Sequence, residues 1–299
     1  MLYREAISQS IVDAMERDPK VLLLGEMVQD PKGVFNTTLE AAQRFPDRVI
    51  ETPISETMIT GACVGLAMEG WKPILVHARA DFSLLSFEHL INTAAKIPFL
   101  HGKPLPFVMR VLVGRGWGQG PVHSQSFHQM LAQVPGLNVV VPSMGSRYGI
   151  CLDIALHHLE GPTVIVEPRR LYDSSLTLHD FRNEGPTDIA ICPIGDTIID
   201  AVEAASTLTQ MGLLVAVNPR DVISQPPEDL SPVPVVYVDM ASNPEAIAPK
   251  GIQCVSQVYE AAYYPTADDI VEAVCRKLGR EYHPQPRKIE EPVVAGGPF

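Results

Sequence analysis

The stretch RVIETPISETMITGACVGLAMEGWKPILVH, residues 48–77, changes its hydrophobic pattern twice. RVIET (48–52) is a short apolar run that predicts a β-strand. Ser55 then occupies an expected helix N-cap position, before small and apolar residues over 57–69 that predict a closely packed helix. KPILVH (72–77) predicts a second strand. Strand, helix and strand in this order favour a parallel sheet with a crossover helix.

The same alternation extends over the first part of the chain, and helices and strands succeed each other as in a parallel sheet with helices on both faces. An N-terminal helix is expected to end at Asp18-Pro19. The further expected elements are strands over 20–26, 106–112, 137–143 and 162–168, and helices over 83–97 and 146–159. In such sheets, ligands bind beyond the carboxyl ends of the strands.

A second, smaller α/β unit is expected after residues 169–187, which lose the hydrophobic periodicity and indicate a linker. Its expected strands cover 188–195, 213–219, 233–240 and 252–258, and its helices 196–212 and 266–279, the latter capped by Thr266. We therefore predict one domain over 1–175, a second over 186–281, and an extended tail over 282–299, which is rich in proline and glycine.

The composition limits the classes of partner. The chain has 35 acidic and 23 basic residues, a formal charge of −12, which disfavours nucleic acid and anionic membranes as partners. No apolar run approaches the roughly 20 residues that span a bilayer. The five cysteines form no CxxC pair, so we predict reduced thiols in a cytoplasmic protein with no metal site on this chain.

Two acid/base candidates emerge from the residues themselves. Glu56, near the start of a helix, either favours the helix dipole or, shielded by small and apolar neighbours, has a raised pKa suited to proton donation. His123 follows the glycine-rich stretch VGRGWGQG (113–120). The adjacent serines do not form a hydrolase elbow, and the glycines match neither phosphate-loop pattern. For Phe82, the residues alone favour simple core packing. The residues alone do not name the chemistry.

Several segments together resemble the beta subunits of thiamine-diphosphate-dependent two-oxoacid dehydrogenases, such as those of pyruvate and acetoin dehydrogenase. The segments are VLLLGE (21–26), VIETPISE (49–56), GACVGLAMEGWKPI (61–74), FEHLINTAAK (87–96), GPVHSQSF (120–127) and VPGLNVVVPS (134–143). The resemblance covers nearly all of residues 1–168. It implies a transketolase-like pyrimidine-binding domain followed by a shortened transketolase C-terminal-like domain.

The resemblance also implies roles for particular residues. Glu56 is expected to hydrogen-bond the aminopyrimidine ring of thiamine diphosphate, with Phe82 packed on that ring and Glu26 also binding the cofactor. His123 is expected to face the reacting carbon and assist proton transfer. The substrate-binding candidates are His77, Arg79 and Arg115; an arginine there can pair with a carboxylate or a phosphate.

The chain lacks the family's G-D-G motif with a following asparagine, so Mg²⁺ and the diphosphate are expected to be held by a separate alpha-type chain, in an alpha2beta2 assembly. The expected reaction cleaves or forms a C–C bond next to a carbonyl, with oxidative decarboxylation of a two-oxoacid as the nearest activity. Alternatives are a non-oxidative acyl or ketol transferase or decarboxylase, and a non-catalytic regulatory or scaffold subunit. The shortened second domain argues against docking of a lipoyl acyltransferase.

Overall fold

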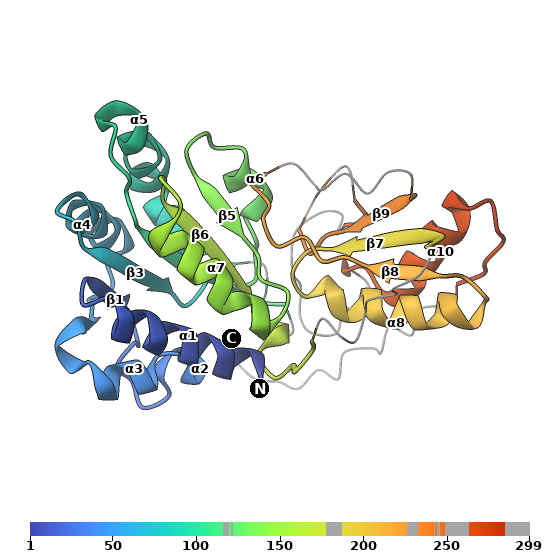
Figure 1. The fold of residues 1–299 in the computed structure, drawn as a ribbon, viewed down its shortest axis with the longest axis horizontal. Helices are drawn as coiled ribbons and strands as arrows, with labels where there is room; N and C mark the ends of the chain where they lie inside the picture. Colours follow the sequence, from blue (N-terminus) through green and yellow to red (C-terminus); the bar gives the residue numbers. More distant parts are fainter. Residues whose placement is uncertain are drawn as a thin grey trace.

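The computed structural model contains two parallel β-sheets, each with its own helices (Figure 1). It describes residues 1–115, 120, 122–177, 187–225, 233–241, 243, 246–248 and 263–284. We call residues 1–177 the first sheet unit and the described residues from 187 onward the second. The expected strand over 252–258 and nearly all of the expected tail lie outside the described residues. The expected domain boundaries remain a prediction.

The first sheet has six strands in the order β2-β1-β3-β4-β6-β5, and all neighbouring strands are parallel. Its strands are β1 (Val21–Gly25), β2 (Val49–Glu51), β3 (Lys72–His77), β4 (Val108–Val113), β5 (Asn138–Val140) and β6 (Thr163–Pro168). Each coincides with a predicted strand, although β4 extends one residue beyond the predicted end. β1, β4 and β6 are buried over their whole length, as expected of strands covered on both faces.

Helices cover both faces of this sheet. Alternate residues along β1 show the two faces: Leu23 packs in the core with Ile7 and Ile11, whereas Leu22 and Leu24 belong to a second core. The helices on the first face are α1 (Tyr3–Arg17), α3 (Leu39–Arg44) and α7 (Gly145–His157), and those on the second are α4 (Glu56–Met68), α5 (Ile97–His101) and α6 (His128–Ala132).

The second sheet contains three parallel strands in the order β8-β7-β9. Its elements are β7 (Ile189–Pro193), α8 (Thr197–Gln210), β8 (Val215–Val217), β9 (Val235–Val238) and α10 (Ala267–Lys277). The predicted cap of α10 is confirmed: the Thr266 side chain accepts a hydrogen bond from the backbone N–H of Asp269, whose carboxylate bonds back to the N–H of Thr266.

Two local predictions were wrong in detail. The expected regular helix over 83–97 consists instead of a 3₁₀ segment (Phe82–Ser86), a π-helical segment (Glu88–Thr93) and a 3₁₀ turn (Ala94–Lys96), and Leu84 in the first of these is 42% exposed. Serine hydroxyls that bond to backbone carbonyls, such as Ser83 to Ala80, compete with regular helical hydrogen bonds here. Ser55 does precede α4, but its hydroxyl makes no capping bond.

The two units meet along strand β5. The backbone N–H of Val141 donates to the carbonyl of Asp221 (2.7 Å), and that of Ile223 donates to Val139 (2.9 Å). The Asp221 carboxylate also accepts from the backbone N–H of Ser143 (2.9 Å) and pairs with Arg147 (2.7 Å). A short segment of the second unit therefore docks on the edge of the first sheet.

A fully buried ion pair lies within the first sheet. Glu167 on β6 accepts from Arg110 on β4 through both oxygens (2.6 and 2.9 Å), and also from the hydroxyls of Tyr148 (2.5 Å) and Tyr172 (2.7 Å). Burial and the neighbouring carboxylate raise the pKa of both tyrosines, so they stay protonated donors.

Among the described residues, no helix is both long and apolar enough to cross a membrane.

We expect Glu167→Gln to destabilise the fold by about 3–5 kcal/mol, because it leaves the Arg110 guanidinium buried without its counter-charge. Urea denaturation measures the change in free energy of unfolding. Glu272→Gln, which removes one partner of an exposed ion pair with Arg276, is the control and should cost less than about 1 kcal/mol. Equal effects of the two substitutions would contradict this account of the buried pair.

Candidate active site

The chain places acidic and imidazole side chains at the carboxyl edge of the first sheet. Glu26 follows the last residue of β1, and His77 is the last residue of β3, its neighbour in the sheet. Glu56 begins α4 after β2, which flanks β1 on its other side. Because parallel strands end at a common edge, three segments distant in sequence meet there.

Glu56 is buried, with an exposed fraction of 9%, at the first position of α4. Among the described residues, Thr60 and Ser86 bond to the backbone carbonyl of Glu56, and its carboxyl makes no hydrogen bond or ion pair. The helix dipole favours a carboxylate at this position, so the structural role weighed from the sequence also holds. A shielded carboxyl without a protein partner is nevertheless suited to bind a polar ligand atom.

Glu26 lies close enough to Glu56 for their charges to interact. Burial raises the pKa of Glu26, and the nearby charges of Glu56 and Glu51 raise it further. The Glu51 carboxylate is fixed by the backbone N–H groups of Met27 (2.6 Å) and Gln29 (2.9 Å). Glu26 therefore binds a proton more readily than an exposed glutamate does, and this places a potential proton donor beside Glu56.

His77 is linked to the start of α4 through Ser86. The Ser86 hydroxyl lies 3.1 Å from Nε2 of His77 and 3.3 Å from the backbone carbonyl of Glu56. Thr60 bonds to both that hydroxyl and that carbonyl, at 2.7 Å each. Burial lowers the pKa of His77 to about 4, so its imidazole is neutral at pH 7. These contacts support the Glu56 backbone; substrate binding by His77 stays a prediction.

Phe82 and His123, which were predicted to belong to one site, are in contact. Their rings meet edge to face, with centroids 5.7 Å apart and an interplanar angle of 83°. The loop can approach because Gly114 has no side chain: a Cβ there would lie 2.5 Å from the His123 carbonyl oxygen. Phe82 also begins the 3₁₀ segment that contains Ser86, which connects this ring pair to Glu56.

Sequence reasoning did not select Asp81 and Gln125 as site residues. The Gln125 amide donates to Oδ1 of Asp81 (2.7 Å), whereas Oδ2 is buried with no hydrogen-bond partner in the described structure. Burial raises the pKa of Asp81, and Gln125 and His123 act in the opposite direction. The only signal was their position, since each lies within two residues of a predicted site residue.

The two arginines differ in their contacts. Arg79 donates to the carbonyl of Ala78 (2.8 Å), and it lies close enough to Asp81 for their charges to interact. The Arg115 guanidinium instead faces the second sheet unit, 3.4 Å from both Asp196 and Asp200 and 4.4 Å from the centre of the Tyr264 ring. Binding of substrate by either arginine stays a prediction.

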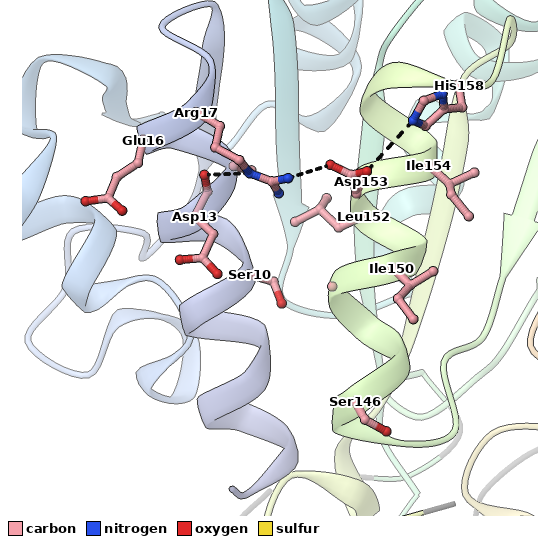
Figure 2. Close-up of a pocket in the computed structure, with 12 residues that line it drawn as sticks. Ser10, Asp13, Glu16, Arg17, Ser146, Ile150, Leu152, Asp153, Ile154 and His158 are labelled. Carbon is pink, nitrogen blue, oxygen red and sulfur yellow. Dashed lines mark hydrogen bonds and ion pairs between the residues drawn. The ribbon is translucent and has the colours of Figure 1, made fainter.

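A separate surface hollow of about 580 Å³ lies between α1 and α7 (Figure 2). Its walls carry Asp13, Glu16 and Arg17 from α1 and Asp153 from α7. Figure 2 shows Arg17 directed toward Asp153, with 3.1 Å between the paired atoms. None of the predicted site residues lines this hollow, so the carboxyl edge of the sheet is the better candidate for chemistry.

Comparison with known proteins gives a consistent family. The model of the transketolase pyrimidine binding domain matches residues 1–174. The mitochondrial beta-1 subunit of the pyruvate dehydrogenase E1 component of Arabidopsis thaliana is 33% identical over 204 residues, which are 67% of this chain and 55% of that protein. The beta subunit of 2-oxoisovalerate dehydrogenase from Bacillus subtilis is 33% identical over 218 residues, 72% of this chain and 64% of that protein.

The chain thus spans less than two thirds of the length of these relatives. Among solved structures, a split-gene transketolase, an inactive beta4 tetramer, is similar over 93% of this chain and 99% of that chain, with a TM-score of 0.75 and 21% identity. This likeness shows the fold. Because the domain model covers more than half of the residues, the chain belongs to the family that carries the transketolase pyrimidine binding domain.

Proposed function

We propose that this chain is the beta-type subunit of a two-chain thiamine-diphosphate enzyme and binds the aminopyrimidine half of the cofactor. The observation that supports the proposal is the buried Glu56, whose carboxyl has no partner among the described residues. Ser86 links its backbone to the 3₁₀ segment of Phe82, whose ring contacts that of His123. The enzyme would cleave or form a C–C bond next to a carbonyl. Its nearest activity is the oxidative decarboxylation of a two-oxoacid, by analogy with the relatives.

The residues fit the aminopyrimidine group in polarity and shape. Glu56 offers a carboxyl for a ring nitrogen, and the half-buried Phe82 offers an aromatic surface for a planar ring. Burial and the charges of Glu56 and Glu51 raise the pKa of Glu26, which lies close enough to Glu56 to interact with it. His123, held at the edge of the Phe82 ring, is placed to exchange a proton with a substrate oxygen or carbon. When bound, thiamine diphosphate would supply the nucleophilic carbon that attacks the carbonyl.

An alpha-type partner would complete the site in an alpha2beta2 assembly. Large apolar side chains are exposed close to the site residues: Ile54 (82%), Leu85 (58%) and Val122 (62%). Such side chains near a polar site are typical of a protein interface. Since the chain lacks the motif for Mg²⁺ and diphosphate, we assign those ligands to the partner. The likeness to the inactive beta4 form of a split-gene transketolase supports a chain that is inactive alone.

The runner-up is a non-oxidative transferase, favoured by the likeness to transketolase structures, which extends to the enzyme of Leishmania mexicana at a TM-score of 0.74. Reduction of a lipoyl domain separates the two functions, because only the dehydrogenase should perform it. A non-catalytic subunit would not need the Glu56, Phe82 and His123 arrangement. A cytoplasmic location stays a prediction, since several relatives are mitochondrial by name.

We expect the purified chain to bind thiamine diphosphate and Mg²⁺ at least about a hundredfold more weakly than the complex with its alpha-type partner, because one half of the cofactor has no ligands on this chain. Isothermal titration calorimetry of the chain, of the partner and of their mixture measures this. Equally tight binding by the chain alone would contradict the division of the site.

Glu56→Gln should slow hydrogen exchange at the reactive carbon of the bound cofactor on the order of a hundredfold, because the amide cannot donate a carboxyl proton to the pyrimidine. Quenched-flow NMR of the complex in D₂O measures the rate. Glu69→Gln, at the exposed C-terminal end of the same helix, is the matched control. An exchange rate in Glu56→Gln equal to that of the control would remove the assigned role.

His123→Ala should lower kcat about a hundredfold or more while leaving assembly with the partner intact, because the imidazole acts on the substrate rather than on the interface. Steady-state kinetics and analytical ultracentrifugation measure the two properties. His101→Ala, at an exposed position at the end of α5, should change neither. Unchanged turnover in His123→Ala would refute the role of this histidine.

A further inference from the structure

The segment that carries His123 ends at a buried contact with the second sheet unit. His128 is fully buried, and its Nε2 lies 2.8 Å from Oδ1 of Asp239, which follows β9. Its Nδ1 lies 2.7 Å from the hydroxyl of Ser126. The next residue, Gln129, donates to the other oxygen of the same carboxylate at 2.6 Å. One carboxylate of the second unit thus holds two consecutive residues at the end of the segment.

Further hydrogen bonds hold the Asp239 carboxylate in place. It also accepts hydrogen bonds from the backbone N–H of Ala241 and the amide of Asn243, both at 3.0 Å. Burial works to raise its pKa, but the contact with His128 and these hydrogen bonds together hold it below the ordinary value. An ionised carboxylate only accepts, so Nε2 of His128 carries hydrogen, and in the neutral ring Nδ1 accepts from Ser126.

The beginning of the segment has a corresponding contact. Arg115, which is 8% exposed, lies 3.4 Å from Asp196, the residue before α8, and 3.4 Å from Asp200 in its first turn. Its guanidinium also lies over the ring of Tyr264. Asp196 is fully buried, so its separation from Arg115 would leave an uncompensated charge.

We propose that Asp196 and Asp239 are positioning residues that hold His123 against Phe82. Asp196 holds Arg115, which follows the Gly114 backbone packed on His123, and Asp239 holds His128. His123 itself is only half-buried, so few contacts of its own side chain fix its position. Two buried carboxylates of the second unit, in contact with Arg115 and His128, restrict the freedom of the described residues 122–127. The second sheet unit therefore determines where the imidazole lies.

The test uses the full chain with Asp196→Asn, Asp239→Asn and both changes together. We expect amide hydrogen exchange over residues 122–127 to become about tenfold faster or more in each single variant, and faster still in the double variant. The ring-current shift of the His123 imidazole protons, caused by the Phe82 ring, should decrease in the same order in NMR spectra. If Asp196 and Asp239 only joined the two units, their substitution would change neither of these signals selectively.

Asp221→Asn is the matched control, because this buried carboxylate also joins the two units but contacts Ser143 and Arg147 rather than the His123 segment. It should leave both signals at their wild-type values. Should Asp239→Asn fail to fold, Asp196→Asn carries the test, because the distance from Asp196 to Arg115 is longer than that from Asp239 to His128. Wild-type exchange and shifts in the folded variants would overturn the proposal.

This inference rests on the proposed function only through the role assigned to His123. Neither measurement needs the cofactor, the partner or turnover, so the anchoring and the proposed function can fail separately. Release of the segment by Asp239→Asn in a chain whose His123→Ala variant retains full turnover would support the anchoring and reject the catalytic role. If both the anchoring and the catalytic role of His123 hold, Asp239→Asn should lower kcat more than it raises KM in the reconstituted complex, because the imidazole acts after the substrate has bound.

Discussion

One constraint underlies the candidate site: Glu56, buried at the start of a helix, has a carboxyl with no partner among the residues that the structure describes. Taking a carboxyl out of water is costly unless a partner replaces the lost hydrogen bonds. Glu56 is held there because β2 ends just before α4, and because Ser86 and Thr60 bond to its backbone carbonyl. The parallel sheet thus presents a group that a ligand can satisfy, and Ser86 connects its backbone to the 3₁₀ segment that carries Phe82.

Much of this arrangement was accessible from the sequence, because local signals determine it. Apolar runs predicted the strands, and Thr266 was identified as a helix cap. The resemblance brought Glu56, Phe82 and His123 together, and the structure places Phe82 and His123 in contact. The irregular helix over 82–96 was not predicted, because hydroxyl–backbone bonds and segments of differing helical type leave the hydrophobic period almost unchanged.

Contacts between distant segments were beyond sequence reasoning. Nothing local indicates that Arg110 would meet Glu167, or that His128 would meet Asp239. Arg115 was predicted to bind substrate, but its described contacts are carboxylates and an aromatic ring of the second unit. These pairs connect elements whose proximity exists only after folding. A buried ion pair is weak evidence for net stability, because the cost of desolvation offsets the attraction between the charges. In the proposal above, such pairs position the residues around His123.

The most direct test of the central claim is an experimental structure of the assembled complex with thiamine diphosphate bound. The account predicts that a carboxyl oxygen of Glu56 lies within about 2.6–3.2 Å of a ring nitrogen of the aminopyrimidine, in a site closed to water by the partner chain. A structure in which Glu56 faces solvent, far from any cofactor, would contradict it.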